Sequence, residues 1–116
     1  MKIEVVSDLS EQRVLSELDP KQRRGIWMAS NEFRRLANGY ARRDTGQLIE
    51  SSYTSSNLAE GIVEWNTPYA SAVYYNRKGT TVSTDKNPNA VDHWADPVIE
   101  RHAEDIARLV EREMSR

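Results

Sequence analysis

Apolar residues recur at helical spacing between Pro20 and Tyr40, and this repeat constrains the fold more than any other feature of the sequence. The repeat consists of Ile26, Ala29, Phe33, Leu36, Ala37 and Tyr40. These offsets place one row of side chains on a single helix face, which must pack against another part of the chain. Asp19 suits the start of the helix as its cap, and Pro20 suits the first helical position, where its missing N–H costs nothing. Asn38-Gly39 suits its end.

The C-terminus predicts a second amphipathic helix. Asp96 and Pro97 repeat the cap-and-proline start. The apolar face that follows consists of Ile99, Ala103, Ile106, Leu109, Val110 and Met114. Charged residues fill the other face, where spacing of four predicts the weak pairs Arg101–Asp105 and Glu104–Arg108. We expect a turn of helix over 89–94 ahead of this helix, with Trp94 buried against the sheet.

Three stretches have the pattern of short strands. Residues 2–6 alternate polar and apolar side chains, as in a half-buried edge strand, and a short amphipathic helix is predicted over 9–18. Residues 50–56 and 61–65 are predicted to form a β-hairpin through a turn at 57–60. The sequence therefore predicts an α+β fold, with a long helix packed on a small antiparallel β-sheet beside a C-terminal amphipathic helix.

The stretch from Gly61 to Asn76 is the one around which we expect the rest to be organised. It contains Trp65 and three of the five tyrosines, and Pro68 ends its strand. The small residues after Tyr69 favour a short helix or an irregular segment on the sheet. Residues 77–89 are polar and predict a mobile loop.

Length and composition limit the class of protein. With 116 residues there is room for one domain, residues 1–116, and 38% hydrophobic with 29% charged residues fits a globular chain. The sequence contains neither an apolar run of membrane-spanning length nor the apolar core of a signal peptide. We therefore expect it to stay in the cytoplasm of the producing cell. The absence of cysteine excludes disulfides and thiolate chemistry.

Charge is unevenly distributed along the chain. Seven basic residues and one glutamate give residues 20–43 a formal charge of +6, and because the whole chain carries -2, the remainder carries -8. A basic helix on an acidic body can meet phosphate or the acidic face of another copy, and we expect self-association. Trp27 lies at the edge of the apolar stripe, so it is either a core residue or an intersubunit contact, and Met28 is expected nearly opposite the stripe.

Asp44-Thr45-Gly46 has the sequence of the catalytic loop of dimeric aspartic proteases, where two carboxylates share a proton. That loop requires an apolar strand before it and apolar surroundings, whereas Arg42 and Arg43 precede it here. We therefore favour a turn in which Gly46 adopts a conformation that other residues avoid, with Leu48 burying the start of the next strand.

The two histidines, His93 and His102, raise the question of a metal site. A structural zinc ion needs more ligands at convergent positions, and His102 falls at the edge of an apolar face. No phosphate-cradling glycine loop or nucleophile elbow occurs. The residues predict no catalysis, cofactor or metal.

Several of these motifs together resemble the small minor capsid proteins of tailed bacteriophages, which belong with the tail-completion or head-tail connector proteins of the neck. The motifs are Asp44-Thr45-Gly46 with Leu48 and Ser51, Val63-x-Trp65-Asn66-Thr67-Pro68-Tyr69-Ala70, Tyr74-Tyr75, and His93-Trp94 before a C-terminal helix. Many relatives carry a proline before the Asp-Thr-Gly turn, where this chain has residues 41–43. The long helix is therefore free to continue towards Asp44.

The resemblance implies the same α+β fold, a ring of identical subunits in the virion of a phage or prophage, and no enzymatic activity. It implies that the partners are further copies and other neck and tail proteins, that the ring is assembled in the bacterial cytoplasm, and that DNA passes through it without specific recognition.

A subunit of such a ring needs two different complementary faces. Our candidate interface residues are Arg24, Trp27, Arg35, Arg77 and Lys78. The alternatives are a nucleic-acid-binding module that uses the basic helix 20–43, and the aspartic protease.

Overall fold

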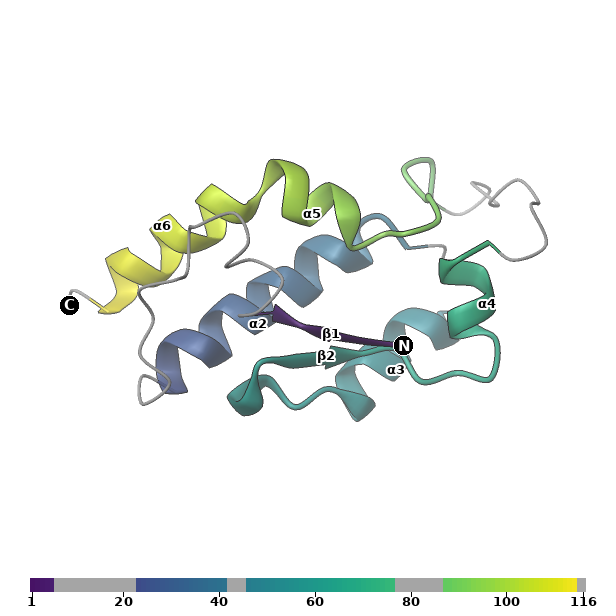
Figure 1. Cartoon of the computed structure of the whole chain (residues 1–116), viewed down its shortest axis with the longest axis horizontal. Helices are drawn as coiled ribbons and strands as arrows, with labels where there is room; N and C mark the ends of the chain where they lie inside the picture. The colour runs from purple at the N-terminus through teal and green to yellow at the C-terminus, as the bar shows by residue number, and fades with distance from the viewer. Residues whose placement is uncertain (6–22, 42–45, 77–86, 115–116) are drawn as a thin grey trace.

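The computed structural model describes residues 1–5, 23–41, 46–76 and 87–114. The elements follow in the order β1 (Lys2–Glu4), α2 (Arg23–Asn38), α3 (Gln47–Ser55), the 3-10 helix η1 (Leu58–Glu60), β2 (Ile62–Glu64), α4 (Ala70–Tyr74), α5 (Asp96–Arg101) and α6 (Ala103–Met114) (Figure 1). The fold is α+β, as predicted. Parts of the chain outside these ranges include the predicted helix at 9–18, the caps at Asp19 and Pro20, and most of the predicted loop at 77–89.

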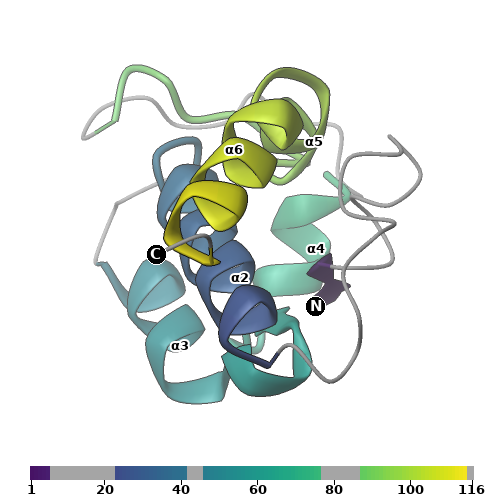
Figure 2. The ribbon, with the colours of Figure 1, turned by 90° about the vertical axis from the view of Figure 1, so that its left-hand side faces the viewer.

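Helix α2 runs through the middle of the molecule, between α3 on one side and the α5–α6 pair on the other (Figure 2). Its predicted apolar stripe is buried: Ala29, Phe33 and Ala37 are fully inaccessible to solvent. Trp65 and Trp94 are also fully buried in the same core, and their rings meet edge to face with centroids 5.7 Å apart. The long helix is therefore the central core element, as its periodicity predicts.

Helix α2 ends earlier than expected from the sequence, which left the helix free to continue towards Asp44. The helix ends at Asn38, and the N–H groups of Gly39 and Tyr40 donate to the carbonyls of Leu36 and Ala37, at 3.0 and 2.9 Å. These short-range hydrogen bonds tighten the last turn. The expected continuation of the helix towards Asp44 does not occur in residues 39–41.

The sheet consists of the antiparallel pair β1 and β2. Lys2 lies opposite Glu64, Ile3 opposite Val63 and Glu4 opposite Ile62. At the end of the pair, the N-terminal amine donates to the Trp65 carbonyl at 3.1 Å, and the Trp65 N–H donates to the Met1 carbonyl at 3.0 Å. The first predicted strand and the strand within 61–65 are thus confirmed, but they pair with each other.

The predicted hairpin of 50–56 with 61–65 is wrong, because the first of these segments is helical. Leu48, Ser51 and Ser52 of α3 are buried at helical spacing. The hydroxyls of Ser51 and Ser52 donate to the carbonyls three residues earlier, each at 2.6 Å. The serine side chains that suggested a strand therefore fit on a helix, because their hydroxyls form hydrogen bonds with carbonyls of the same helix. The predicted turn at 57–60 contains η1.

The short helix predicted after Tyr69 and the C-terminal helix are both present, although the second is divided in two. A short helix, α4, follows Tyr69, and Trp94 is fully buried. The predicted turn of helix over 89–94 is wrong: these residues are not helical, and His93 has a φ of +45°, outside the range of a right-handed helix. The C-terminal helix is divided at His102, whose φ of -121° and ψ of 0° separate α5 from α6. Asp96 lies in the first turn of α5, because Ala95 occupies the cap position. Across the residues described, no helix is both long and apolar enough to cross a membrane.

Candidate functional site

A buried hydrogen-bond chain fixes α3 against α2. The Trp65 indole N–H donates to Asn38 Oδ1 at 2.9 Å, and Asn38 Nδ2 donates to Ser52 Oγ at 2.9 Å. All three residues are almost or fully inaccessible to solvent. Since each polar group is paired, the chain orients the two helices without the cost of an unsatisfied buried atom. These hydrogen bonds therefore also fix the solvent-facing sides of α2 and α3 relative to each other.

On that surface, the Arg34 guanidinium stacks over the ring of Tyr53. The guanidinium carbon lies 4.2 Å from the ring centroid, within range of a cation–π interaction. Arg34 also donates to Asn31 Oδ1 at 3.0 Å and to the Ser52 carbonyl at 3.5 Å. Tyr53 remains 56% exposed. The pair is therefore ordered by the fold while one side of the ring faces solvent.

Trp27 lies two helical turns before Arg34 on the same side of α2, and it is 47% exposed. Arg24, one turn before Trp27, is also exposed. We call Arg24, Trp27, Arg34 and Tyr53 the basic–aromatic surface. A large indole exposed on the same side of a helix as an ordered arginine–tyrosine pair is typical of a binding surface, because Trp, Tyr and Arg are enriched among the residues that contribute most to binding.

Arg35 lies three turns after Arg24 on the same side of α2, but its side chain pairs with another residue of the same helix. Its guanidinium donates three hydrogen bonds to the carboxylate of Glu32, and the side chain is 65% exposed. The hydrogen bonds to Glu32 and that residue's negative charge raise the pKa of Arg35. Arg35 thus carries less uncompensated charge than the sequence suggests.

The structure brings three of the five predicted interface residues to one side of α2: Arg24, Trp27 and Arg35. Arg77 and Lys78 lie outside the described residues. Of the two interpretations of Trp27, burial in the core is wrong. Met28 is also placed differently from its prediction, since it is half-buried and packs against the core. Tyr53 was missed because its segment was assigned to a strand. The spacing of Leu48, Ser51 and Ser52 was the available signal for a helix.

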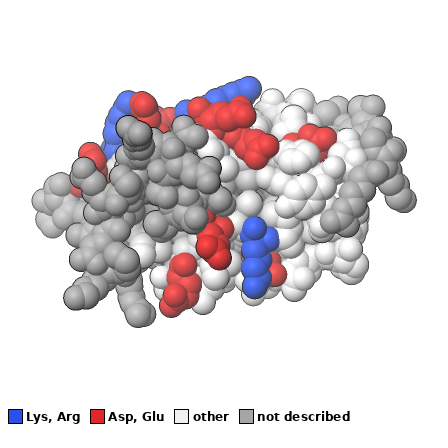
Figure 3. Space-filling model, viewed as in Figure 1, with Lys and Arg blue, Asp and Glu red and all other residues white. Residues whose placement is uncertain are grey.

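Charges on the outer side of the C-terminal helices are mixed. Figure 3 shows acidic and basic side chains alternating along the edge formed by α5 and α6. Arg108 contacts Glu104 at 3.3 Å, as predicted, and Asp105 at 3.6 Å. Surface pairs of this kind contribute little, typically below about 1 kcal/mol each. The described residues of this edge therefore present both signs of charge to a partner.

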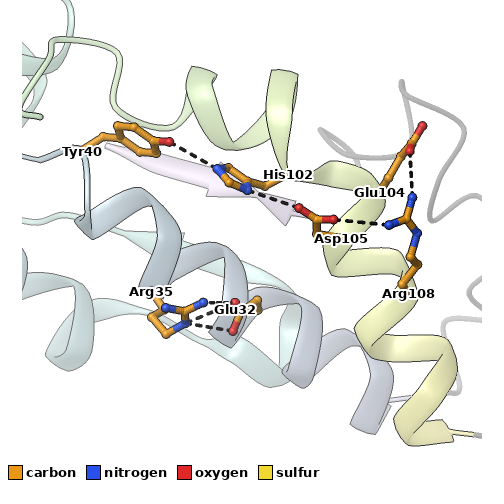
Figure 4. A network of polar contacts seen from close by, with 7 residues as sticks. All are labelled: Glu32, Arg35, Tyr40, His102, Glu104, Asp105 and Arg108. Carbon is orange, nitrogen blue, oxygen red and sulfur yellow. Dashed lines mark hydrogen bonds and ion pairs between the residues drawn. The ribbon is translucent and has the colours of Figure 1, made fainter.

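A second polar network joins the end of α2 to the start of α6 (Figure 4). Tyr40 Oη lies 3.2 Å from His102 Nε2, and His102 Nδ1 lies 3.5 Å from Asp105 Oδ2. The ring of His102 is thus held from both sides at the break between α5 and α6. Within the described residues, no three His, Asp or Glu side chains converge on a possible metal ion.

The Asp-Thr-Gly segment is described only from its glycine. Gly46 has φ of +78°, as the turn prediction requires, and Leu48 is buried, although on a helix. Asp44 and Thr45, and with them the protease alternative, lie outside the described residues.

Comparison with known proteins adds no relative: no family model, no curated protein and no solved structure matches this chain.

Proposed function

We propose that this chain is a structural protein of a tailed phage or prophage virion, one subunit of a ring in the head-tail connector, without catalytic activity. The phage assignment rests on the motif resemblance of Val63-x-Trp65-Asn66-Thr67-Pro68-Tyr69-Ala70 and the segments around it. Its partners are further copies of the same chain and the adjoining neck and tail proteins, and assembly takes place in the cytoplasm of the bacterial host.

The observation that carries the proposal is the exposure of Trp27 on the basic–aromatic surface. Exposing about half of an indole costs hydrophobic free energy that a partner would recover, at roughly 25 cal/mol per Å² of apolar area. Arg24 lies one turn before Trp27, and Arg34, which stacks on Tyr53, lies two turns after it on the same side of α2; Trp, Tyr and Arg are the residue types found at the centres of interfaces. This combination supports a protein-binding role for the outer side of α2.

The proposal is tested by comparing variants in sedimentation velocity over a concentration series. Trp27→Ala should weaken self-association by roughly 30-fold, the effect of an interface hot spot of about 2 kcal/mol. Arg24→Glu should weaken it as well, and more strongly at low salt. The matched control is Arg101→Glu on α5, an exposed arginine outside the basic–aromatic surface. Equal self-association of Trp27→Ala and wild type would contradict the proposed role of this surface.

A nucleic-acid-binding role is the second candidate, favoured by two exposed aromatic rings close to arginines. Single-stranded nucleic acids stack on such rings while basic side chains meet the phosphates. However, Arg34 is engaged by Tyr53 and Asn31, and Arg35 by Glu32, which reduces the charge available to phosphate. Salt-dependent retention of short DNA that is lost in Trp27→Ala would favour this candidate over the connector.

A further inference from the structure

Asn38 is followed by Gly39, and this is the one Asn-Gly dipeptide in the sequence. In such a pair the backbone nitrogen of the glycine can attack Cγ of the asparagine side chain. The new N–Cγ bond closes a cyclic imide, the Cγ–Nδ2 bond breaks, and Nδ2 leaves as ammonia. Water then opens the imide to aspartate or to its β-linked isomer. Glycine favours this reaction, because it has no side chain to hinder the attack and its backbone is free to reach the required conformation.

The structure opposes each requirement of this reaction. The attacking nitrogen must lose its proton, but the Gly39 N–H donates to the Leu36 carbonyl at 3.0 Å. The attacked side chain must turn towards that nitrogen, but Asn38 Oδ1 accepts from the Trp65 indole and Asn38 Nδ2 donates to Ser52 Oγ, each at 2.9 Å. Water must reach the imide, but Asn38 is only 4% exposed. In the closed structure the nitrogen, the side chain and the solvent are therefore all kept from reacting.

The chain after this dipeptide is held as well. Asn87 Nδ2 donates to the carbonyls of Gly39 and Ala41, at 3.0 and 2.8 Å. Asn87 is itself protected from the same reaction, because Pro88 follows it and the proline nitrogen carries no proton to lose. Attack on Asn38 therefore requires a local opening at the C-terminal end of α2 that breaks these hydrogen bonds and those of Asn38 together. The rate of the reaction then measures how often that opening occurs.

Modification of Asn38 opposes closure of the opened chain. The direct product, aspartate, brings a carboxylate to a site that is 4% exposed, and it lacks the Nδ2 donor for Ser52 Oγ. The two residues that bond to the Asn38 side chain, Trp65 and Ser52, are uncharged, so burial of that carboxylate is costly. The β-linked product lengthens the backbone between residues 38 and 39, where the N–H groups of Gly39 and Tyr40 complete the last turn of α2. Either product therefore destabilises the folded chain.

We propose that Asn38–Gly39 is a deamidation site that the fold keeps unreactive, and that each opening at the end of α2 exposes it to irreversible modification. The hydrogen bond from Asn38 to Ser52 is the contact that closes the site. The stability of this contact thus sets the chemical lifetime of the chain at neutral pH. The inference is independent of the proposed function and of any partner.

Timed incubation of the full chain at neutral pH tests the inference, with trypsin digestion and mass spectrometry as the readout. Cleavage after Arg35 and Arg42 releases the peptide of residues 36–42, whose one side-chain amide is that of Asn38. Conversion of an amide to an acid in this peptide is therefore assigned to Asn38. We expect conversion in the folded chain to be at least roughly 100-fold slower than in the chain unfolded in guanidinium chloride, as for an opening populated about 1% of the time or less.

Two outcomes of this comparison would overturn the inference. Equal rates in the folded and the unfolded chain would show that the fold does not protect Asn38. Absence of conversion in the unfolded chain would show that the dipeptide is not reactive in this sequence. The proposed ring is judged by its mass in solution, so neither outcome bears on it.

Ser52→Ala tests the contact that closes the site. It removes the acceptor for Asn38 Nδ2 and should speed conversion in the folded chain roughly tenfold, the effect of about 1.4 kcal/mol on the opening equilibrium. The matched control is Thr54→Ala on the same helix, because Thr54 is exposed and its hydroxyl bonds to the Ser51 carbonyl. Circular dichroism checks that both variants fold. Equal rates in the two folded variants would contradict the proposed role of Ser52.

Asn38→Asp reproduces the direct product of the reaction and tests its consequence. We expect its midpoint in urea to lie below that of wild type, because the carboxylate is buried. Asn66→Asp makes the same change of charge at an exposed asparagine, and it should keep a midpoint close to that of wild type. Equal midpoints for the two variants would show that modification of Asn38 does not prevent closure.

Discussion

The Trp65 indole N–H donates to Asn38 Oδ1 at 2.9 Å, and this hydrogen bond joins the residue after β2 to the last residue of α2. Asn38 in turn donates to Ser52 of α3 at 2.9 Å. One buried amide therefore connects the sheet and both helices that form the basic–aromatic surface. The aromatic core and the exposed surface are linked through this residue.

Replacement of Asn38 should be strongly destabilising. Asn38→Ala leaves the Trp65 N–H without its acceptor and removes the donor to Ser52, so the free energy of unfolding should fall by about 2–4 kcal/mol. Urea denaturation measures the change. Asn66→Ala, at an exposed asparagine, is the control and should change stability by less than about 0.5 kcal/mol. Equal stability of the two variants would show that the buried amide is not essential to the fold.

Tyr40 and His102 should be energetically coupled. Their side chains are 3.2 Å apart and join the end of α2 to the break between α5 and α6. We expect a double-mutant cycle of Tyr40→Phe and His102→Ala to give a coupling of about 0.5–1.5 kcal/mol. Additive effects of the two substitutions would indicate that the contact contributes nothing. Exposed Tyr53→Phe paired with His102→Ala provides a cycle in which additivity is expected.

Gly46 should tolerate asparagine better than alanine. Its φ of +78° is unfavourable for side chains, although a Cβ would meet no atom within 4 Å. The cost of Gly46→Ala, roughly 1 kcal/mol, therefore comes from the backbone conformation and not from a clash. Gly46→Asn should cost less, because asparagine enters the left-handed region more readily. Thermal unfolding of both variants gives the comparison, and a larger loss for asparagine would refute the conformational explanation.

Alkaline pH should destabilise the protein through Tyr74. Burial, and next the negative charge of Asp96, raise the pKa of this phenol well above its ordinary value of 10.0. In the unfolded chain the phenol loses its proton near pH 10, whereas in the folded chain it keeps it. The folded state then binds more protons, so the free energy of unfolding falls as pH rises above 10.

Unfolding experiments at neutral and alkaline pH check this dependence. Tyr74→Phe should lose less stability than wild type between pH 9 and about pH 11, because it removes the group whose titration differs between the two states. Tyr53→Phe, at an exposed tyrosine on α3, is the control and should change the slope less than Tyr74→Phe does. Identical slopes for wild type and Tyr74→Phe would contradict the assignment to Tyr74.

The periodic spacing of apolar residues was sufficient to predict the central helix. The same kind of spacing predicted the C-terminal helix. Phe33 and Ala37 lie on the buried face because a spacing near 3.6 residues leaves little choice once a helix forms. For residues 50–56, serine and threonine suggested a strand, whereas the segment is helical. Tertiary packing of Leu48 and hydroxyl bonds to the helix backbone prevailed over that local preference.

The candidate surface could be predicted only in part. Arg24, Trp27 and Arg35 share a helix face by spacing alone, but the stacking of Arg34 on Tyr53 joins two helices and depends on tertiary structure. The pairing of Arg35 with Glu32 was within reach of the sequence, since the two residues are three apart. The contacts between residues 74–76 and 92–93 also depend on tertiary structure, and no local pattern in the sequence shows them.

Self-assembly through two different faces is the central claim, and the mass in solution tests it most directly. We would measure light scattering after size exclusion over a concentration series at low and high salt, and image any large species. We predict a closed ring whose mass is a multiple of 13.3 kDa and which dissociates at higher protein concentration in Trp27→Ala than in wild type. A strict dimer that forms equally well in Trp27→Ala would contradict it and direct attention back to Asp44.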